Sequence, residues 1–180
     1  MDSIDNRVWE VLCSEEDIKR RVKELGEQLS ADYANKNLYV VSLLRGSFIF
    51  AADLLRELTI PVKINFMTTS SYQHQLHSSG TVKILSDIKE DLTGYDVLIV
   101  DDIADSGLTM NHVIEHLKNK NPSSIKACVL LDKPERRKVK IKPNYIGFTI
   151  PDKFVVGYGL NYGDYYRNIP YVFVVTDKKR

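Results

Sequence analysis

Apolar positions along the chain change repeatedly between a helical and a strand-like period. From residue 18 to residue 33 they recur three or four positions apart, which places them on one helical face: Ile18, Val22, Leu25, Leu29 and Tyr33. Ser14 precedes this run, and Asp17 follows three residues later, a pattern typical of a capped helix start. Helical periods over 48–58 and 108–117 predict two further helices.

Short apolar runs separate these helical segments and predict strands. They cover residues 38–44, 62–67, 81–85, 97–100 and 125–131. The runs at 38–44 and 97–100 are almost unbroken, which is typical of strands covered on both faces. Strands that alternate with helices predict an α/β fold with a mostly parallel open sheet and helices on both of its faces.

Two stretches depart from this alternation. Residues 68–80 are mostly Ser, Thr, Gln and His without an apolar period, so we expect a long loop that closes over a site as a lid. From about residue 132 the chain becomes rich in Pro, Gly and Tyr, with short strands and turns. We interpret 132–180, with the N-terminal residues, as a small hood lobe over a core of about 14–131, all within a single domain.

Composition excludes several classes of protein. The chain has 180 residues and a net charge of +1, so no overall charge points to a nucleic-acid partner. No apolar run approaches the length of a membrane span, and the first residues do not resemble a signal peptide, which predicts a cytoplasmic protein. Cys13 and Cys128 lack the spacing of a zinc site and are expected to be small apolar residues.

Three acids follow the strongest strand, where ligands bind in an open parallel sheet. Asp101, Asp102 and Asp105 repel one another, and a bound Mg²⁺ or the hydroxyls of a sugar would compensate. Ser106 and Gly107 then lead into a helix, whose free N–H groups suit a phosphate. Turn and cap residues of a purely structural kind have a similar composition, so spacing alone leaves both interpretations open.

These residues and four other segments resemble a known family. Asp101 to Thr109, counted from Val97, is similar to the thirteen-residue motif of type I phosphoribosyltransferases. The other segments resemble their hypoxanthine-guanine branch: 43–46 its pyrophosphate loop with a non-proline cis peptide before the glycine, Ser71-Tyr72 the start of its mobile loop, 131–137 its base-recognition segment, and 150–159 its base-stacking motif. The likeness runs from about residue 38 to residue 175.

The resemblance implies a magnesium-dependent purine salvage enzyme that makes IMP or GMP and pyrophosphate from phosphoribosyl pyrophosphate and hypoxanthine or guanine. Asp101 and Asp102 would bind the ribose hydroxyls, directly or through Mg²⁺, and Asp105 would handle the proton at purine N7. The remaining contacts with the two substrates that the resemblance implies are made by Arg45, Gly46, Ser71, Tyr72, Ser106, Gly107, Leu108, Thr109, Lys133, Phe154, Val155 and Arg167.

The chain departs from the family pattern at four positions. Asn161 replaces an aspartate that ligates a second Mg²⁺; it keeps an oxygen ligand without the charge. Arg45 replaces a frequent lysine, Asp101 a frequent glutamate and Ser106 a frequent threonine. We also expect the protein to assemble as a homodimer or homotetramer.

Three other interpretations compete with this one. A nucleotide sensor or RNA-binding protein on the same fold would not need Asp105 or Lys133, and no basic stripe with interleaved aromatics is present. A xanthine-preferring transferase is disfavoured by the motif at 153–159, although the altered position 161 keeps it open. Residues 157–163 superficially resemble a dinucleotide fingerprint, but the glycine spacing is wrong and no crossover helix follows.

Overall fold

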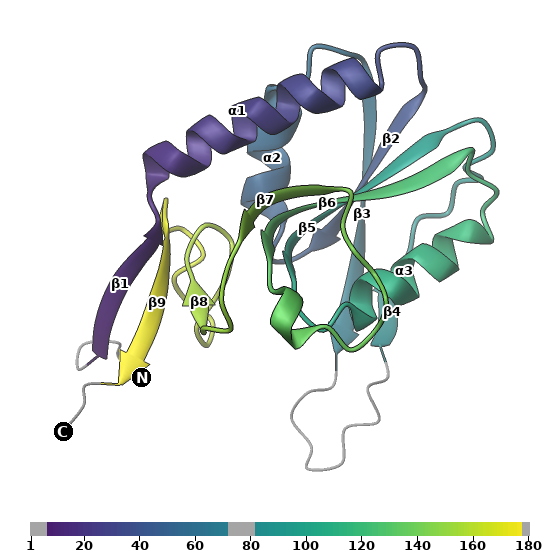
Figure 1. The fold of residues 1–180 in the computed structure, drawn as a ribbon. Helices are drawn as coiled ribbons and strands as arrows, with labels where there is room; N and C mark the ends of the chain where they lie inside the picture. Colours follow the sequence, from purple (N-terminus) through teal and green to yellow (C-terminus); the bar gives the residue numbers. More distant parts are fainter. Residues whose placement is uncertain (1–6, 72–81, 178–180) are drawn as a thin grey trace.

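A computed structural model describes residues 7–71 and 82–177 as a six-stranded sheet, three α-helices and a separate three-stranded sheet (Figure 1). The large sheet has the order β4-β3-β2-β5-β6-β7, and only β4 runs antiparallel. Its elements are β2 Leu38–Leu44, β3 Val62–Ser71, β4 Val82–Ser86, β5 Asp96–Ala104, β6 Ser124–Asp132 and β7 Tyr145–Thr149. The predicted α/β class and mostly parallel sheet are confirmed.

Helices cover both faces of this sheet, as its central strands require. Along β2, Leu38 and Val40 join the apolar core under α1 (Glu15–Asp32) and α2 (Phe48–Arg56). The alternate residues Tyr39 and Val41 join a second core under α3 (Leu108–Lys118). Side chains of a strand point to opposite faces in turn, so an almost unbroken apolar run fills both cores.

The first helix begins where its cap predicts. The Ser14 hydroxyl accepts the backbone N–H of Asp17 at 3.1 Å and donates to the Asp17 carboxylate at 2.7 Å. Such a cap satisfies a donor that the helix start would otherwise leave unpaired. The five apolar residues that share the predicted face, from Ile18 to Tyr33, are all buried.

Several boundaries differ from those expected from the sequence, and two of them change the interpretation of the loop and the hood. The strand β3 extends through Thr68–Ser71, because these residues pair antiparallel with β4 despite their polar side chains. Residues 68–71 of the predicted loop are therefore strand, and its residues 72–80, Tyr72 included, lie outside the described residues. The strand β7 pairs with β6 in the large sheet, so that sheet continues past residue 131 into the stretch interpreted as hood.

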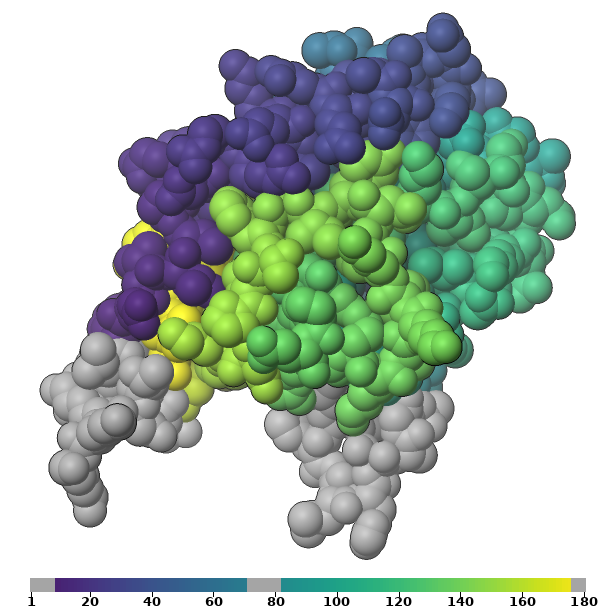
Figure 2. All heavy atoms as spheres, viewed as in Figure 1, coloured from purple at the N-terminus to yellow at the C-terminus, as the bar shows by residue number. Residues whose placement is uncertain are grey.

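The three-stranded sheet joins distant parts of the chain. It has the order β1-β9-β8, in which β9 (Val172–Asp177) pairs antiparallel with both β1 (Arg7–Cys13) and β8 (Val155–Val156). In the space-filling view the first strand, in purple, and the last, in yellow, lie together at one side of the molecule (Figure 2). This sheet lies beside the large one (Figure 1).

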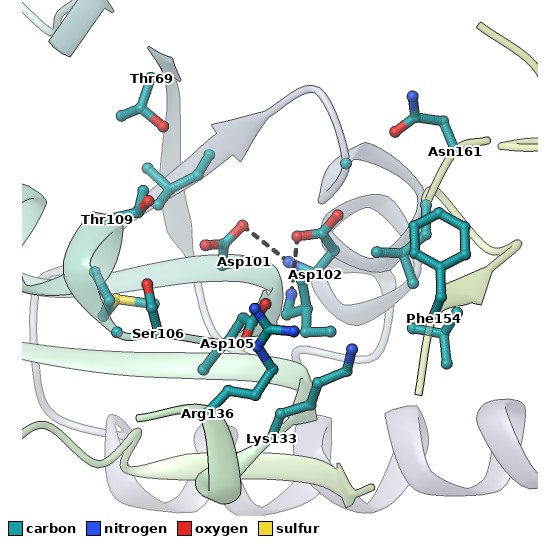
Figure 3. A pocket seen from close by; sticks show the side chains of 18 of the residues that line it. Thr69, Asp101, Asp102, Asp105, Ser106, Thr109, Lys133, Arg136, Phe154 and Asn161 are labelled. Carbon is teal, nitrogen blue, oxygen red and sulfur yellow. Dashed lines mark hydrogen bonds and ion pairs between the residues drawn. The ribbon is translucent and has the colours of Figure 1, made fainter. Parts of the chain in front are cut away.

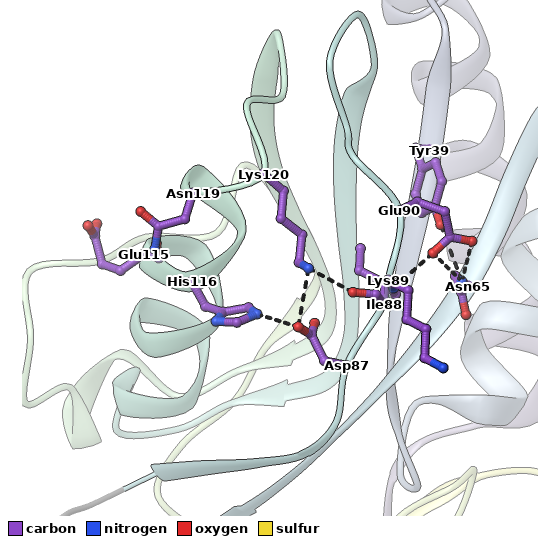
Figure 4. Close-up of polar contacts among 10 residues, drawn as sticks. All are labelled: Tyr39, Asn65, Asp87, Ile88, Lys89, Glu90, Glu115, His116, Asn119 and Lys120. Carbon is purple, nitrogen blue, oxygen red and sulfur yellow. Dashed lines mark hydrogen bonds and ion pairs between the residues drawn. The ribbon is translucent and has the colours of Figure 1, made fainter.

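An ionic cluster ties the connection after β4 to α3. Asp87 accepts from His116 Nε2 at 2.8 Å and lies 3.2 Å from Lys120 Nζ, which also donates to the Ile88 carbonyl at 2.7 Å (Figure 4). Burial raises the pKa of the Asp87 carboxyl, but the hydrogen bonds from His116 and Lys120 outweigh it and leave that pKa lowered. Within residues 7–71 and 82–177, no helix is long and apolar enough to cross a membrane.

Candidate active site

A cavity of about 550 Å³ opens at the carboxyl end of the central strands (Figure 3). That volume is within the range of pockets for small ligands. The predicted site residues that line it are Gly46, Asp101, Asp102, Asp105, Ser106, Gly107, Thr109, Lys133, Phe154, Val155 and Asn161. Arg45, Leu108 and Arg167 do not line it, Ser71 ends β3 without a described side chain, and Tyr72 is outside the described residues.

Two carboxylates at the end of β5 form the floor of the cavity. The backbone N–H of Asp102 donates to Asp101 Oδ1 at 3.0 Å, and that of Ile103 donates to Asp102 Oδ1 at 2.8 Å. Burial raises the pKa of both carboxyls, and the charge of Asp102 raises that of Asp101 further. A cation or a set of hydroxyls in the cavity would offset this crowded negative charge.

A glycine loop approaches this pair very closely. A Cβ atom at Gly46 would lie 1.7 Å from Asp102 Oδ2, and one at Gly159 would lie 2.1 Å from the Gly46 carbonyl oxygen. Gly159 also has a φ of +101°, which favours glycine. The cis peptide that the resemblance implies before the glycine is the Leu44–Arg45 bond. Because glycine has no Cβ, the segments that contain Gly46, Asp102 and Gly159 can pack this closely.

Arg167 supports the same glycine from behind. Its Nη1 donates to the Gly159 carbonyl at 2.6 Å, and the Gly159 N–H donates to the Arg167 carbonyl at 2.9 Å. Burial and the nearby charge of Arg45 lower the pKa of the Arg167 guanidinium. Arg167 therefore holds the wall of the cavity, while Arg45 is exposed outside it.

The turn after β5 presents a helix N-terminus to the cavity. Gly107 precedes α3 with a φ of +80°, and a Cβ there would lie 2.6 Å from the Ile141 side chain. The Leu108 N–H donates to Ser106 Oγ at 3.3 Å, and the side chains of Ser106 and Thr109 point into the cavity (Figure 3). A helix start of this kind, with two hydroxyls beside it, suits a phosphate.

Asp105 lies at the other side of that turn, with the guanidinium of Arg136 in front of its carboxylate. Arg136 Nε is 3.0 Å from Asp105 Oδ1, yet that buried oxygen accepts no hydrogen bond from the residues that the structure describes. The two atoms attract one another through charge, and the N–H is not aimed at the oxygen. Arg137 instead donates to the Asp105 backbone carbonyl at 2.8 Å and pairs with Asp132.

Lys133 and Phe154 face each other across the opening (Figure 3). Lys133 is only 6% exposed, and its Nζ donates to the Lys153 carbonyl at 2.5 Å. Burial lowers the pKa of its ammonium group, although Asp105 and Asp152 favour the charged form. Phe154 is 54% exposed, and its ring meets Tyr162 edge-on at 5.9 Å. A flat ring could stack on Phe154 while Lys133 donates to it.

Several lining residues were not singled out from the sequence, among them Thr69, Arg136 and Asp152. Thr69 was placed in the loop because its polar neighbours hid the strand. Arg136 and Asp152 stand within the segments 131–137 and 150–159, so the resemblance already covered them without giving them a role. Asn161 lines the cavity and donates its amide to the Gly163 carbonyl, which leaves only its side-chain oxygen for a ligand.

Comparison with known proteins agrees with this geometry. A family model described as "Phosphoribosyl transferase domain" matches residues 9–163. The hypoxanthine-guanine phosphoribosyltransferase of Aquifex aeolicus is 48% identical over 178 residues, which is 98% of this chain and 100% of the relative. The hypoxanthine phosphoribosyltransferase of Escherichia coli K12 is 48% identical over 165 residues, 91% of this chain and 93% of the relative.

Solved structures lead to the same family. The crystal structure of a hypoxanthine phosphoribosyltransferase from Staphylococcus aureus has a TM-score of 0.90 and 42% identity, and covers 98% of this chain and 96% of that one. The match therefore includes the three-stranded sheet as well as the large one. The chain belongs to the phosphoribosyltransferase family.

Proposed function

We propose that the protein is a purine salvage enzyme that transfers the phosphoribosyl group of phosphoribosyl pyrophosphate to hypoxanthine or guanine. One observation carries the proposal: a single cavity joins the Asp101–Asp102 pair, the start of α3, and the facing Lys133 and Phe154. These are the partners that a sugar, a phosphate and a flat base require. Each of these features alone has a structural explanation as well, and only together do they match the two substrates.

The carboxyl edge of the sheet would hold the phosphoribosyl group. Asp101 and Asp102 would bind the ribose hydroxyls, and the turn from Asp105 to Thr109 would bind the 5′-phosphate at the start of α3. The backbone of the Arg45–Gly46 loop would meet the pyrophosphate, with Arg167 keeping Gly159 pressed against that loop. This arrangement fixes the anomeric carbon between the leaving group and the base.

Magnesium fits this cavity as an ion that takes its oxygen ligands from both the protein and the substrate. Four acids and two bases line the cavity, so a polyanionic substrate needs added positive charge there. Among the described residues no cluster of three acid, cysteine or histidine ligands occurs, which suits an ion that also binds substrate oxygens. Asp101 and Asp102, with the Asn161 oxygen, would hold it. When bound, Mg²⁺ would neutralise charge on the pyrophosphate leaving group.

The base would lie between Phe154 and Lys133. The Lys133 ammonium would donate to the O6 atom of hypoxanthine or guanine, while an amino group there, as in adenine, offers it no acceptor. The carbonyl of Val155 would face the Watson–Crick edge of the base. As purine N9 bonds to the anomeric carbon, the bond to pyrophosphate breaks and Asp105 takes the proton from N7. Assembly as a homodimer or homotetramer and a cytoplasmic location stay predictions.

Substitution of Asp105 tests this assignment. Asp105→Asn keeps the size and removes the base, so kcat should fall about 10²- to 10⁴-fold. Affinity for phosphoribosyl pyrophosphate should change much less, because backbone N–H groups, Ser106 and Thr109 hold its phosphate. Asp91→Asn, on a surface turn away from the cavity, is the matched control.

The measurement is turnover with Mg²⁺, phosphoribosyl pyrophosphate and each of hypoxanthine, guanine, xanthine and adenine. If Asp105→Asn loses both phosphoribosyl pyrophosphate binding and turnover, Asp105 is a structural turn residue. Faster turnover with xanthine than with hypoxanthine or guanine would replace the proposed base preference. Absence of turnover with all four bases in the unaltered protein would reject the enzyme itself.

A further inference from the structure

Arg136 contacts two carboxylates that line the cavity, those of Asp105 and Asp152. Its Nε lies 3.0 Å from Asp105 Oδ1, and its Nη1 lies 3.4 Å from Asp152 Oδ1. The Arg136 side chain is 48% exposed, whereas that of its neighbour Arg137 is 14% exposed and is fixed by Asp132. Arg136 can therefore shift between partners while Arg137 cannot.

The guanidinium of Arg136 occupies the space in front of Asp105 (Figure 3). A purine whose N7 reaches that carboxylate would need the same space. The contact is also poorly formed, since Asp105 Oδ1 accepts no hydrogen bond within the described part of the chain. Arg136 thus covers Asp105 without binding it in the geometry of a strong charged pair, and displacing it costs little.

Asp152 is well placed to receive the displaced cation. It stands two residues before Phe154, in a turn that Lys153 N–H closes onto the Pro151 carbonyl at 2.8 Å. The same turn is tied to β6 by the Ile150 N–H, which donates to the Asp132 carbonyl at 2.9 Å. Its position is therefore set by the elements that form the base site, and it does not depend on Arg136.

We propose that Arg136 is a positioning residue that exchanges carboxylates during the reaction, covering Asp105 in the empty site and moving onto Asp152 when the purine stacks on Phe154. The inference rests on the proposed function. Lys133 has a different role, because its Nζ is held in place by one hydrogen bond to the Lys153 carbonyl and keeps its other N–H groups for the base. Arg137 cannot exchange, because it binds the backbone of Asp105. The exchange keeps a positive charge beside the Asp105 carboxylate until the N7 atom of the purine, which gives it a proton, is bound.

The test compares Arg136→Gln, Asp152→Asn and the double variant. Arg136→Gln removes the group that must be displaced, so KM for hypoxanthine should fall about two- to fivefold, the range of a half-exposed ion pair, with kcat nearly unchanged. Asp152→Asn leaves Arg136 only Asp105 as a partner, so the same KM should rise about two- to fivefold. The double variant should behave like Arg136→Gln, because without Arg136 the loss of Asp152 has no effect.

Arg20→Gln, which removes an exposed arginine paired with Asp17, is the matched control and should leave all constants unchanged. Thermal melting of each variant separates unfolding from altered binding, and Arg136→Lys supplies a second variant that keeps the charge and loses Nε. If the two single effects simply combine in the double variant, so that its KM returns to near that of the unaltered protein, the exchange is overturned. A tenfold loss of kcat in Arg136→Gln at saturating hypoxanthine would overturn it as well. The proposed function fails separately, through absence of turnover in the unaltered protein.

Discussion

Replacement of Gly46 by alanine should damage the use of phosphoribosyl pyrophosphate more than it damages folding. The added Cβ would lie 1.7 Å from Asp102 Oδ2 and 2.6 Å from Asp102 Cγ, so the carboxylate must rotate away. Rotation breaks the 2.8 Å hydrogen bond that Asp102 accepts from the Ile103 N–H. No left-handed φ occurs at Gly46, so the effect is steric and not a backbone strain.

The size of the effect follows from overpacking. Inserting a methyl group into a filled site costs typically about 1–3 kcal/mol. If the overpacking moves Asp102 away from the ribose and weakens its binding by this energy, kcat/KM for phosphoribosyl pyrophosphate should fall about five- to 150-fold. The KM for hypoxanthine should change little, because Lys133 and Phe154 are untouched. Steady-state kinetics with each substrate varied in turn measures both values.

Gly26→Ala supplies a control with the same kind of clash and no contact with the cavity. Its Cβ would lie 2.4 Å from Glu57 Cβ, where α1 packs near the end of α2. Alanine suits a helix better than glycine by roughly 0.5–1 kcal/mol, which offsets part of the overpacking. Gly26→Ala should lower the melting temperature and leave kcat/KM unaltered. Equal kinetic losses in the two variants would refute the reasoning for Gly46.

Three further results are expected. Excess chelator should abolish turnover, and full activity in chelator would contradict the proposed role of Mg²⁺. Asn161→Asp should lower the Mg²⁺ concentration needed for half-maximal turnover, and should strengthen Mg²⁺ binding by calorimetry; unchanged titrations would remove Asn161 from the ligand set. Asp87→Asn should cost about 0.5–1 kcal/mol of stability at neutral pH, or about 1–4 °C in melting temperature. Because the folded pKa of Asp87 lies below its ordinary 3.8, this difference should persist above that pH and disappear as pH falls through the lower value. A pH-independent difference would argue against the ionic cluster.

The parts of the fold that sequence predicted well are those with strong periodicity. The face of α1 from Ile18 to Tyr33 is buried as expected, since a 3.6-residue period leaves few alternatives. The strand at 38–44 was bounded correctly, because Asn37 and the Arg45–Gly46 loop interrupt its apolar run. By contrast, β3 continues through the polar residues Thr68–Ser71, where pairing with β4 decides the structure and side-chain polarity does not.

The site shows the same division. Residues clustered in sequence, from Asp101 to Thr109, were found from the chemistry of one strand end and one helix start. The contact of Arg136 with both Asp105 and Asp152 joins three separate segments, and no spacing rule predicts it. The approach of Gly46 to Gly159 is equally a product of packing, although each glycine was visible in its own motif.

The pairing of β1 with β9 has a consequence for the order in which the protein is made. The large sheet is complete once β7 has been synthesised, so the ribose and phosphate end could form on the ribosome. Phe154, in contrast, is held by the Val175 N–H, which donates to its carbonyl at 3.2 Å. Among the strands that the structure describes, β8 pairs only with β9. The three-stranded sheet that holds Phe154 can therefore form only after β9, the last strand, has been synthesised. A nascent chain could therefore bind the sugar phosphate before it is able to choose a purine.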